Sequence, residues 1–154
     1  MSSIRKAVFI FSIHTLFTGS VYAFDLRKAY GLSLDTKLDQ SKFSTVTAEG
    51  KKGMLFVTLK TETGAFVYVK IDNNKNITRI LVEQKFNTIR ECSISNEKSQ
   101  KELKSINPNI GYYAMDDSDM YYINPHLITF SCEKRKNAFY LIVDRWNEKT
   151  NSQT

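Results

Sequence analysis

Residues 54–86 decide the fold, and they read MLFVTLKTETGAFVYVKIDNNKNITRILVEQKF. Within this stretch apolar side chains recur at every second position, which is the period of a β-strand with one buried face. The segments 61–64 (TETG) and 72–76 (DNNKN) are rich in residues that suit tight turns. The pattern therefore predicts a three-stranded antiparallel meander formed by Met54–Lys60, Ala65–Asp72 and Ile77–Phe86.

The middle strand of this meander also carries two aromatic residues, Phe66 and Tyr68, on the face opposite Val67 and Val69. They indicate either a second buried surface or a binding patch. Because an antiparallel sheet needs a cover on at least one side, we expect a helix to bury them.

A helix is predicted over Ser95–Ile106, directly after the meander. Ser95 suits the N-cap, and Asn107-Pro108 is a typical stop signal. The apolar stripe is narrow, with Leu103 and Ile106 as its large members, so the helix is expected on the rim of the sheet with most of its surface in water.

The last third of the chain returns to the strand pattern. An acidic turn, Asp116–Asp119, separates the first two strands. The final strand has apolar residues on both faces, which is typical of a central strand buried on both sides. The polar residues 147–154 that follow it are expected to form a disordered tail. The predicted strands are Ile110–Met115, Met120–Ile123, His126–Glu133 and Asn137–Trp146.

Residues 1–23 have the pattern of a cleavable secretory signal. Two basic residues precede the apolar run 7–17, and Ala23 lies immediately before the expected cut at Phe24. The apolar run is too short to span a bilayer, which takes about 20 residues. The signal holds two of the 22 basic residues and none of the 16 acidic ones, so the remaining chain has a net charge of +4. We therefore expect a periplasmic or secreted protein with a single domain over 24–146.

The segment Phe24–Phe43 is predicted to be a lead-in followed by a short helix, with Ser33 or Asp35 as its cap. Its first part, FDLRKAYGLSLDTKLDQ, resembles the opening of small secreted and periplasmic α+β proteins of Gram-negative bacteria. That resemblance covers about 20 residues and implies the compartment and the general style of fold.

Two cysteines, Cys92 and Cys132, remain after the signal. In an oxidising compartment they are expected to form a disulfide. The alternative is that one thiol acts as a nucleophile with His126 as its base, but no catalytic motif surrounds either cysteine.

The sequence shows no fingerprint of catalysis or of a cofactor site, and we predict neither a catalytic residue nor a metal or other cofactor. Asp116, Asp117 and Asp119 lack the glycine and the distal glutamate of a calcium-binding loop. A carboxylate pair for hydrolysis would have to come from acids whose positions sequence does not relate. These acids are Glu49, Glu62, Glu83, Glu91 and Asp144.

The fold class predicted is α+β, an antiparallel sheet with one or two short helices in the order strands, helix, strands. This layout resembles the sheet-plus-helix modules of envelope assembly factors and of secreted inhibitor or immunity proteins. An exported chain is not expected to meet nucleic acid. Because the chain is small, exported, stapled by a disulfide and without a catalytic motif, we expect a non-enzymatic protein that binds another exported or envelope protein, for example as an inhibitor or immunity factor. The alternatives are an envelope assembly factor that contacts membrane or cell wall, and a small hydrolase.

Basic residues beside exposed tyrosines are typical of a protein-binding surface, and the predicted contact residues are Lys134, Arg135, Lys136 and the exposed member of the pair Tyr121-Tyr122. The sequence sets no oligomeric state.

Overall fold

The computed structural model describes residues 28–58 and 64–151, so the predicted signal and its cleavage site lie outside the described residues. The ten strands are β1 (Lys28–Ala29), β2 (Leu32–Ser33), β3 (Ser44–Thr47), β4 (Leu55–Thr58), β5 (Phe66–Ile71), β6 (Ile77–Phe86), β7 (Gly111–Ala114), β8 (Asp119–Ile123), β9 (His126–Arg135) and β10 (Ala138–Asn147). The helices are α1 (Ile89–Ile106) and α2 (Glu148–Asn151).

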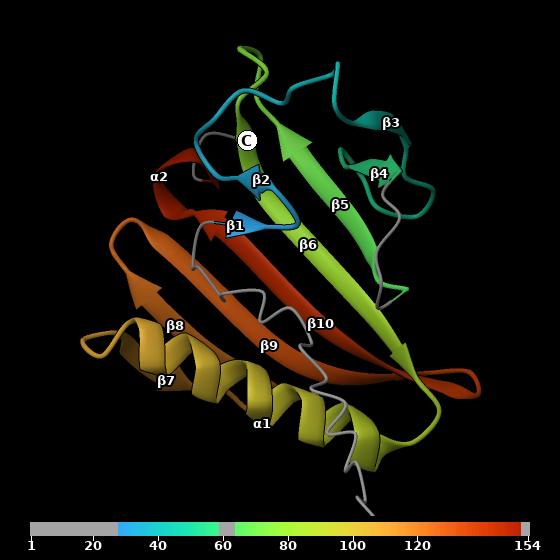
Figure 1. The fold of residues 1–154 in the computed structure, drawn as a ribbon, viewed down its shortest axis with the longest axis vertical. Coiled ribbons are helices and arrows are strands. Elements are labelled where there is room, and N and C mark those ends of the chain that lie inside the picture. Colours follow the sequence, from blue (N-terminus) through green and yellow to red (C-terminus); the bar gives the residue numbers. More distant parts are fainter. Residues whose placement is uncertain (1–27, 59–63, 152–154) are drawn as a thin grey trace, which may run out of the picture.

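Eight strands form one antiparallel sheet in the order β3-β4-β5-β6-β10-β9-β8-β7. Each half of the chain forms a four-stranded meander, and α1 connects the two halves (Figure 1). The predicted meander β4-β5-β6 and the α+β class are confirmed. The last strand of each meander meets the other at the centre, where β6 and β10 pair from Phe86 with Phe139 to Arg79 with Trp146. The prediction that the final strand is central and buried on both sides is therefore also confirmed.

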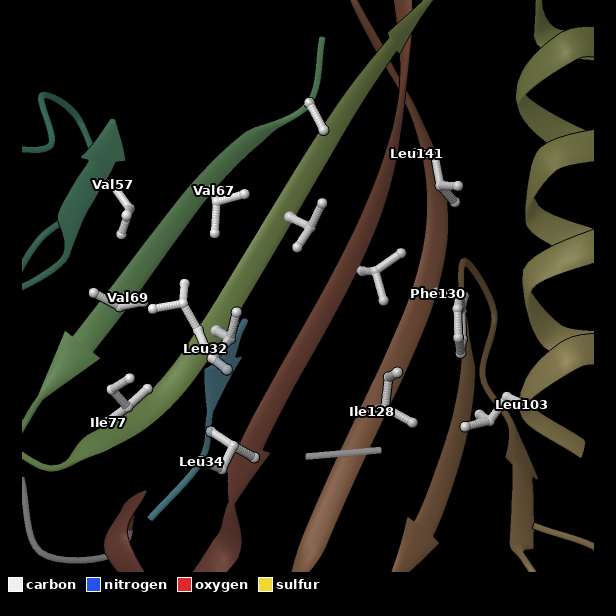
Figure 2. Close-up of a cluster of buried hydrophobic side chains, with 14 of the residues drawn as sticks. Leu32, Leu34, Val57, Val67, Val69, Ile77, Leu103, Ile128, Phe130 and Leu141 are labelled. Atoms are coloured by element: carbon white, nitrogen blue, oxygen red, sulfur yellow. The ribbon is translucent and has the colours of Figure 1, made fainter. Parts of the chain in front are cut away.

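The main hydrophobic core lies between one face of this sheet and the segments that cover it. The helix covers the end near β9, and the β1–β2 hairpin covers the end near β6 (Figure 1). Leu103 from α1 and Leu32 and Leu34 from the N-terminal segment point toward side chains of the sheet (Figure 2). Fully buried sheet residues in this core include Val67, Val69, Ile80, Ile128 and Phe130.

The predicted helix within Phe24–Phe43 is wrong for the described residues. Residues 28–33 form a β-hairpin instead, with Tyr30 (φ 51°) and Gly31 (φ 80°) at its turn. Leu32 and Leu34 alternate with polar residues, and an extended backbone places both of them on the sheet, where each is 2% exposed. The burial of these two leucines on an extended segment outweighs the local signal for a helix N-cap.

The helix α1 begins earlier than predicted, at Ile89 rather than near Ser95. Thr88 is its N-cap and forms a capping box with Glu91: the Thr88 hydroxyl accepts from the Glu91 amide, and the Glu91 carboxylate accepts from the Thr88 amide. The end at Ile106 agrees with the prediction. The buried stripe consists of Cys92, Ser99 and Leu103, whereas Ile106 is 46% exposed, which corrects its predicted place in the contact.

The predicted disulfide is confirmed, since Cys92 in the first turn of α1 is bonded to Cys132 in β9. The expected disordered tail is wrong at its start, because Asn147 belongs to β10 and is 8% exposed, and Glu148–Asn151 form α2.

Candidate functional site

The face of the sheet opposite α1, called here the open face, carries the functional candidates. The expectation that a helix covers Phe66 and Tyr68 is wrong, because α1 packs on the other face. The loop 48–53 covers the open face only in part. Ala48 and Met54 at its ends are buried against Leu81 and Ile142, while Phe66 stays 44% exposed.

A buried carboxylate, Glu83 of β6, organises the centre of the open face. The side chain is 5% exposed, and its Oε1 accepts from Lys51 Nζ at 2.6 Å and from Arg135 Nη1 at 2.9 Å. Burial raises the pKa of Glu83, but the hydrogen bonds from the two cations outweigh burial and leave that pKa below its ordinary value. Glu83 is therefore ionised in the folded protein and holds both cations in place.

The same two cations also lie over tyrosine rings. Lys51 Nζ is 4.7 Å from the ring centre of Tyr68, and the guanidinium of Arg135 is 5.2 Å from that of Tyr140. Burial, and then the nearby charge of Glu83, raise the pKa of Tyr68. Arg135 additionally binds Glu133 through Nη2 at 2.9 Å. The result is a rigid arrangement of Tyr, Lys and Arg side chains around one carboxylate.

A second fixed arginine lies on the same face. Arg79 Nε donates to Asp144 Oδ1 at 2.9 Å, and its Nη2 donates to Oδ2 of the same carboxylate. The hydrogen bonds to Asp144 raise the pKa of Arg79 above its ordinary value. In contrast, Lys70 and Lys85 form no ion pair with any described residue.

These groups form one continuous patch, called here the basic patch, which the strand register defines. Lys85 pairs with Tyr140, Phe66 with Glu83, and Lys70 with Arg79. Lys85 and Lys70 therefore lie at its two ends, roughly 20 Å apart. The acids on this patch are neutralised by their partners, so its net charge is positive. Its members are Lys51, Phe66, Tyr68, Lys70, Arg79, Lys85, Arg135 and Tyr140.

The structure separates the predicted contact residues. Arg135 and Tyr122 lie on the open face, and Tyr122 is 48% exposed. Tyr121 is fully buried on the helix face, where its hydroxyl donates to Gln100 Oε1 at 2.6 Å. Lys134 lies on that same face, and Lys136 is in the turn with φ 53°. The turn between β9 and β10 consists only of residues 136 and 137, because Arg135 pairs with Ala138, so β9 extends two residues beyond its predicted end at Glu133.

The other candidate groups have structural partners. Both cysteines are in the disulfide, so neither is a free thiol. Asp119 accepts hydrogen bonds from Gln100 Nε2 and from the Tyr112 hydroxyl, each at 2.7 Å, and the bond that Tyr112 donates to this carboxylate raises the pKa of Tyr112. Within residues 28–58 and 64–151, no group of three or more His, Cys, Asp or Glu is placed to hold a metal ion. Glu91 caps α1, and Glu62 lies outside the described residues.

His126 takes part in a joint that ties the N-terminal segment to the ends of β9 and β10. Its Nε2 lies 2.6 Å from Asp35 Oδ2, and Asn147 Nδ2 donates to Asp35 Oδ1 at 2.9 Å. Asp35 has φ 64°, in the left-handed region that Asp and Asn tolerate better than most residues. A pocket beside this joint is lined by Leu32, Phe43 and Ile77 together with polar residues that include Lys37 and Lys42.

Substitution of Asp35 tests this joint. We expect Asp35→Ala to lower the free energy of unfolding by about 2 kcal/mol, since it removes two hydrogen bonds and the short polar side chain that helps Asp to adopt a positive φ. Asp35→Asn keeps the backbone tolerance and one acceptor, so its loss should be no more than about half as large. Urea denaturation of the wild type and of the two variants measures these losses. If both variants were as stable as the wild type, the carboxylate would contribute nothing to the joint.

The ion cluster of the open face was not predicted, because its members come from distant parts of the chain. Lys51, Glu83 and Arg135 meet only when the loop 48–53, β6 and β9 are in place. One signal was present: Glu83 directly follows the apolar run ILV (residues 80–82), in a strand expected to be well buried.

Comparison with models of protein families, with curated proteins and with solved structures found no match in any of the three. In the part of the chain that the structure describes, neither helix has the length and the apolar character needed to cross a membrane.

Proposed function

We propose that this chain is a non-enzymatic exported protein that uses the basic patch to bind an acidic surface of another exported or envelope protein, as an inhibitor or immunity factor would. The observation that carries this proposal is the set of aromatic and cationic side chains, held by ion pairs and ring contacts, on the sheet face opposite α1, which no helix of the described residues covers. The disulfide supports export, since such bonds persist in oxidising compartments.

The composition of the basic patch supports protein binding. Tyrosine and arginine are the residues that most often dominate the energy of protein interfaces. Here Arg79 and Arg135 are already held by Asp144 and Glu83. Their side chains are therefore ordered before a partner arrives, which lowers the entropic cost of binding.

The charge of the basic patch supports an acidic partner. Lys70 and Lys85 at its two ends have no carboxylate partner among the described residues, while Glu83 and Asp144 are each neutralised by a cation. A partner that presents Asp or Glu side chains about 20 Å apart would complement both ends.

A charge reversal tests the proposal. The exported, oxidised protein is used to capture proteins from an envelope extract, and the captured protein is then purified and titrated. We expect Lys70→Glu/Lys85→Glu to weaken that binding at least about tenfold, because two attractive charges become repulsive. Lys37→Glu/Lys98→Glu is the matched control, since both lysines are exposed and lie outside the basic patch, and it should bind like the wild type. Thermal unfolding of both variants checks that the fold is retained.

Two further measurements distinguish a protein partner from membrane or cell wall. Co-sedimentation with vesicles of anionic lipid and with peptidoglycan measures contact with membrane and cell wall. A partner protein that binds both charge-reversed variants equally well contradicts the proposal. Binding to vesicles or peptidoglycan with no protein partner contradicts it as well, and favours an envelope assembly factor.

A further inference from the structure

The hairpin β7–β8 concentrates exposed apolar side chains at one edge of the sheet. β7 is the outermost strand on that side, next to β8. Five large apolar side chains on this hairpin and its ends are between 41% and 61% exposed, half of the ten such side chains found in the described ranges. They form what is called here the edge patch: Tyr112, Tyr113, Met115, Tyr122 and Ile123.

The edge strand itself carries neither a charge nor a proline, two features that often keep sheet edges apart. Residues 111–114 read GYYA, without a charge or a proline, although proteins commonly place lysine, proline or bulges there. Tyr112 and Tyr113 point to opposite faces of the sheet, and both are exposed, because β7 is the outermost strand of the described sheet. Its backbone can therefore accept a further strand.

Both faces of this edge are already ordered. On the open face the ring of Tyr122 lies directly over Gly111, where an added β-carbon would come within 2.3 Å of Tyr122 Cζ. On the helix face the Tyr112 hydroxyl donates to Asp119 Oδ1 at 2.7 Å, and Lys104 Nζ lies 5.2 Å from the Tyr112 ring centre. An ordered edge loses little conformational entropy when it associates.

We propose that the edge patch is a dimer interface, in which β7 pairs antiparallel with β7 of a second copy of this chain and the two sheets become continuous. A twofold axis perpendicular to the sheet keeps like faces together and makes the contact self-complementary. In the proposed register, Tyr113 lies opposite Tyr113 of the second copy, and Tyr112 pairs with Ala114 of that copy. Asp116 of one copy then lies beside Tyr112 and Lys104 of the other, on the helix face.

Charge complementarity favours a second copy as the occupant. The turn after β7 is acidic, with Asp116 and Asp117 exposed, and the last turns of α1, which end just before β7, carry the exposed cations Lys101 and Lys104. The symmetric pairing brings acidic and basic segments together twice. This inference does not rest on the basic patch, which lies around β5, β6 and β10.

The oligomeric state of the exported, oxidised protein tests this dimer, by sedimentation equilibrium over a wide range of concentration. We expect a monomer–dimer equilibrium that Tyr113→Lys weakens at least about tenfold, because it places two lysines opposite each other across the axis. Val46→Lys is the matched control on the other edge strand, β3, where Val46 is 57% exposed, and it should leave the dimer unchanged.

A charge exchange tests the register. Asp116→Lys should weaken the dimer, and adding Lys104→Glu should restore it, because the pair is rebuilt with reversed signs. A protein that stays monomeric at every concentration overturns the proposal. So does a dimer that survives Tyr113→Lys or is lost on Val46→Lys. Neither Tyr113→Lys nor Val46→Lys changes a residue of the basic patch. Measuring both partner binding and the oligomeric state of these variants therefore distinguishes a failure of the dimer proposal from a failure of the proposed function.

Discussion

Loss of the Cys92–Cys132 disulfide is expected to lower the free energy of unfolding by about 4 kcal/mol. The bond closes a loop with a sequence separation of 40 and ties α1 to β9. Without it the unfolded chain gains the conformational freedom of that loop. A loss of this size is a large share of the roughly 5–15 kcal/mol that stabilises a domain. Urea denaturation of the oxidised protein, compared with the double variant Cys92→Ala/Cys132→Ala, measures the effect.

The reductant provides the control for this prediction. Adding it to the wild-type protein should reproduce most of the loss without changing any side-chain volume, and adding it to the double variant should change nothing. If the reduced wild type were as stable as the oxidised one, the bond would contribute no net stability, and packing of α1 alone would hold the helix.

Replacement of Glu83 by Gln is expected to cost about 2–3 kcal/mol at neutral pH. Removing one member of a buried ion cluster leaves the other charges without compensation, which typically costs about 3–5 kcal/mol. The side chains of Lys51 and Arg135 are 21% and 39% exposed, so water screens part of that cost. Glu49→Gln is the matched control, because Glu49 is an exposed glutamate at the start of the same loop, and its effect should be within about 0.5 kcal/mol.

The pH dependence of this difference has a definite sign. The folded-state pKa of Glu83 lies below its ordinary value of 4.5, so ionised Glu83 stabilises the folded state fully above about pH 4.5. That contribution is lost as the pH falls through the folded-state pKa, where both states bind the proton. The stability difference between wild type and Glu83→Gln should therefore shrink on acidification below pH 4.5, as measured by urea denaturation along a pH series. A difference that stays constant there would contradict the ion cluster.

Local patterns predicted most strands well, because each strand carries its own two-residue period. Apolar residues at every second position predict the meander around Val67 and Ile80 and the central strand with Leu141 and Val143. This pattern is the same whichever strands pair with one another. Errors arose where two local signals competed. Ser95 is a plausible cap, yet Thr88 and Glu91 form the real one, and Asp35 is a joint rather than a helix cap.

The site could be predicted only in fragments. Arg135 and Tyr122 were chosen because they lie beside other basic or aromatic residues in the sequence, but strand alternation sends Tyr121 and Lys134 to the opposite face. Their neighbours in space come from other strands, since Glu83 and Tyr140 surround Arg135. Sequence neighbours on a strand never share a face, so a run of adjacent residues cannot describe a sheet surface.

Sequence patterns sufficed for the α+β class, for the succession of strands, helix and strands after residue 54, and for the pairing of the two cysteines. These follow from periodicity and composition, which act within a few residues. The packing of distant segments, in contrast, sets which sheet face stays open and which strand forms the edge, and it brings Lys51, Glu83 and Arg135 together. The ion cluster depends on contacts between residues 32 and 52 positions apart, and the order of the sheet depends on the pairing of β6 with β10. A local pattern carries no information about such distant contacts.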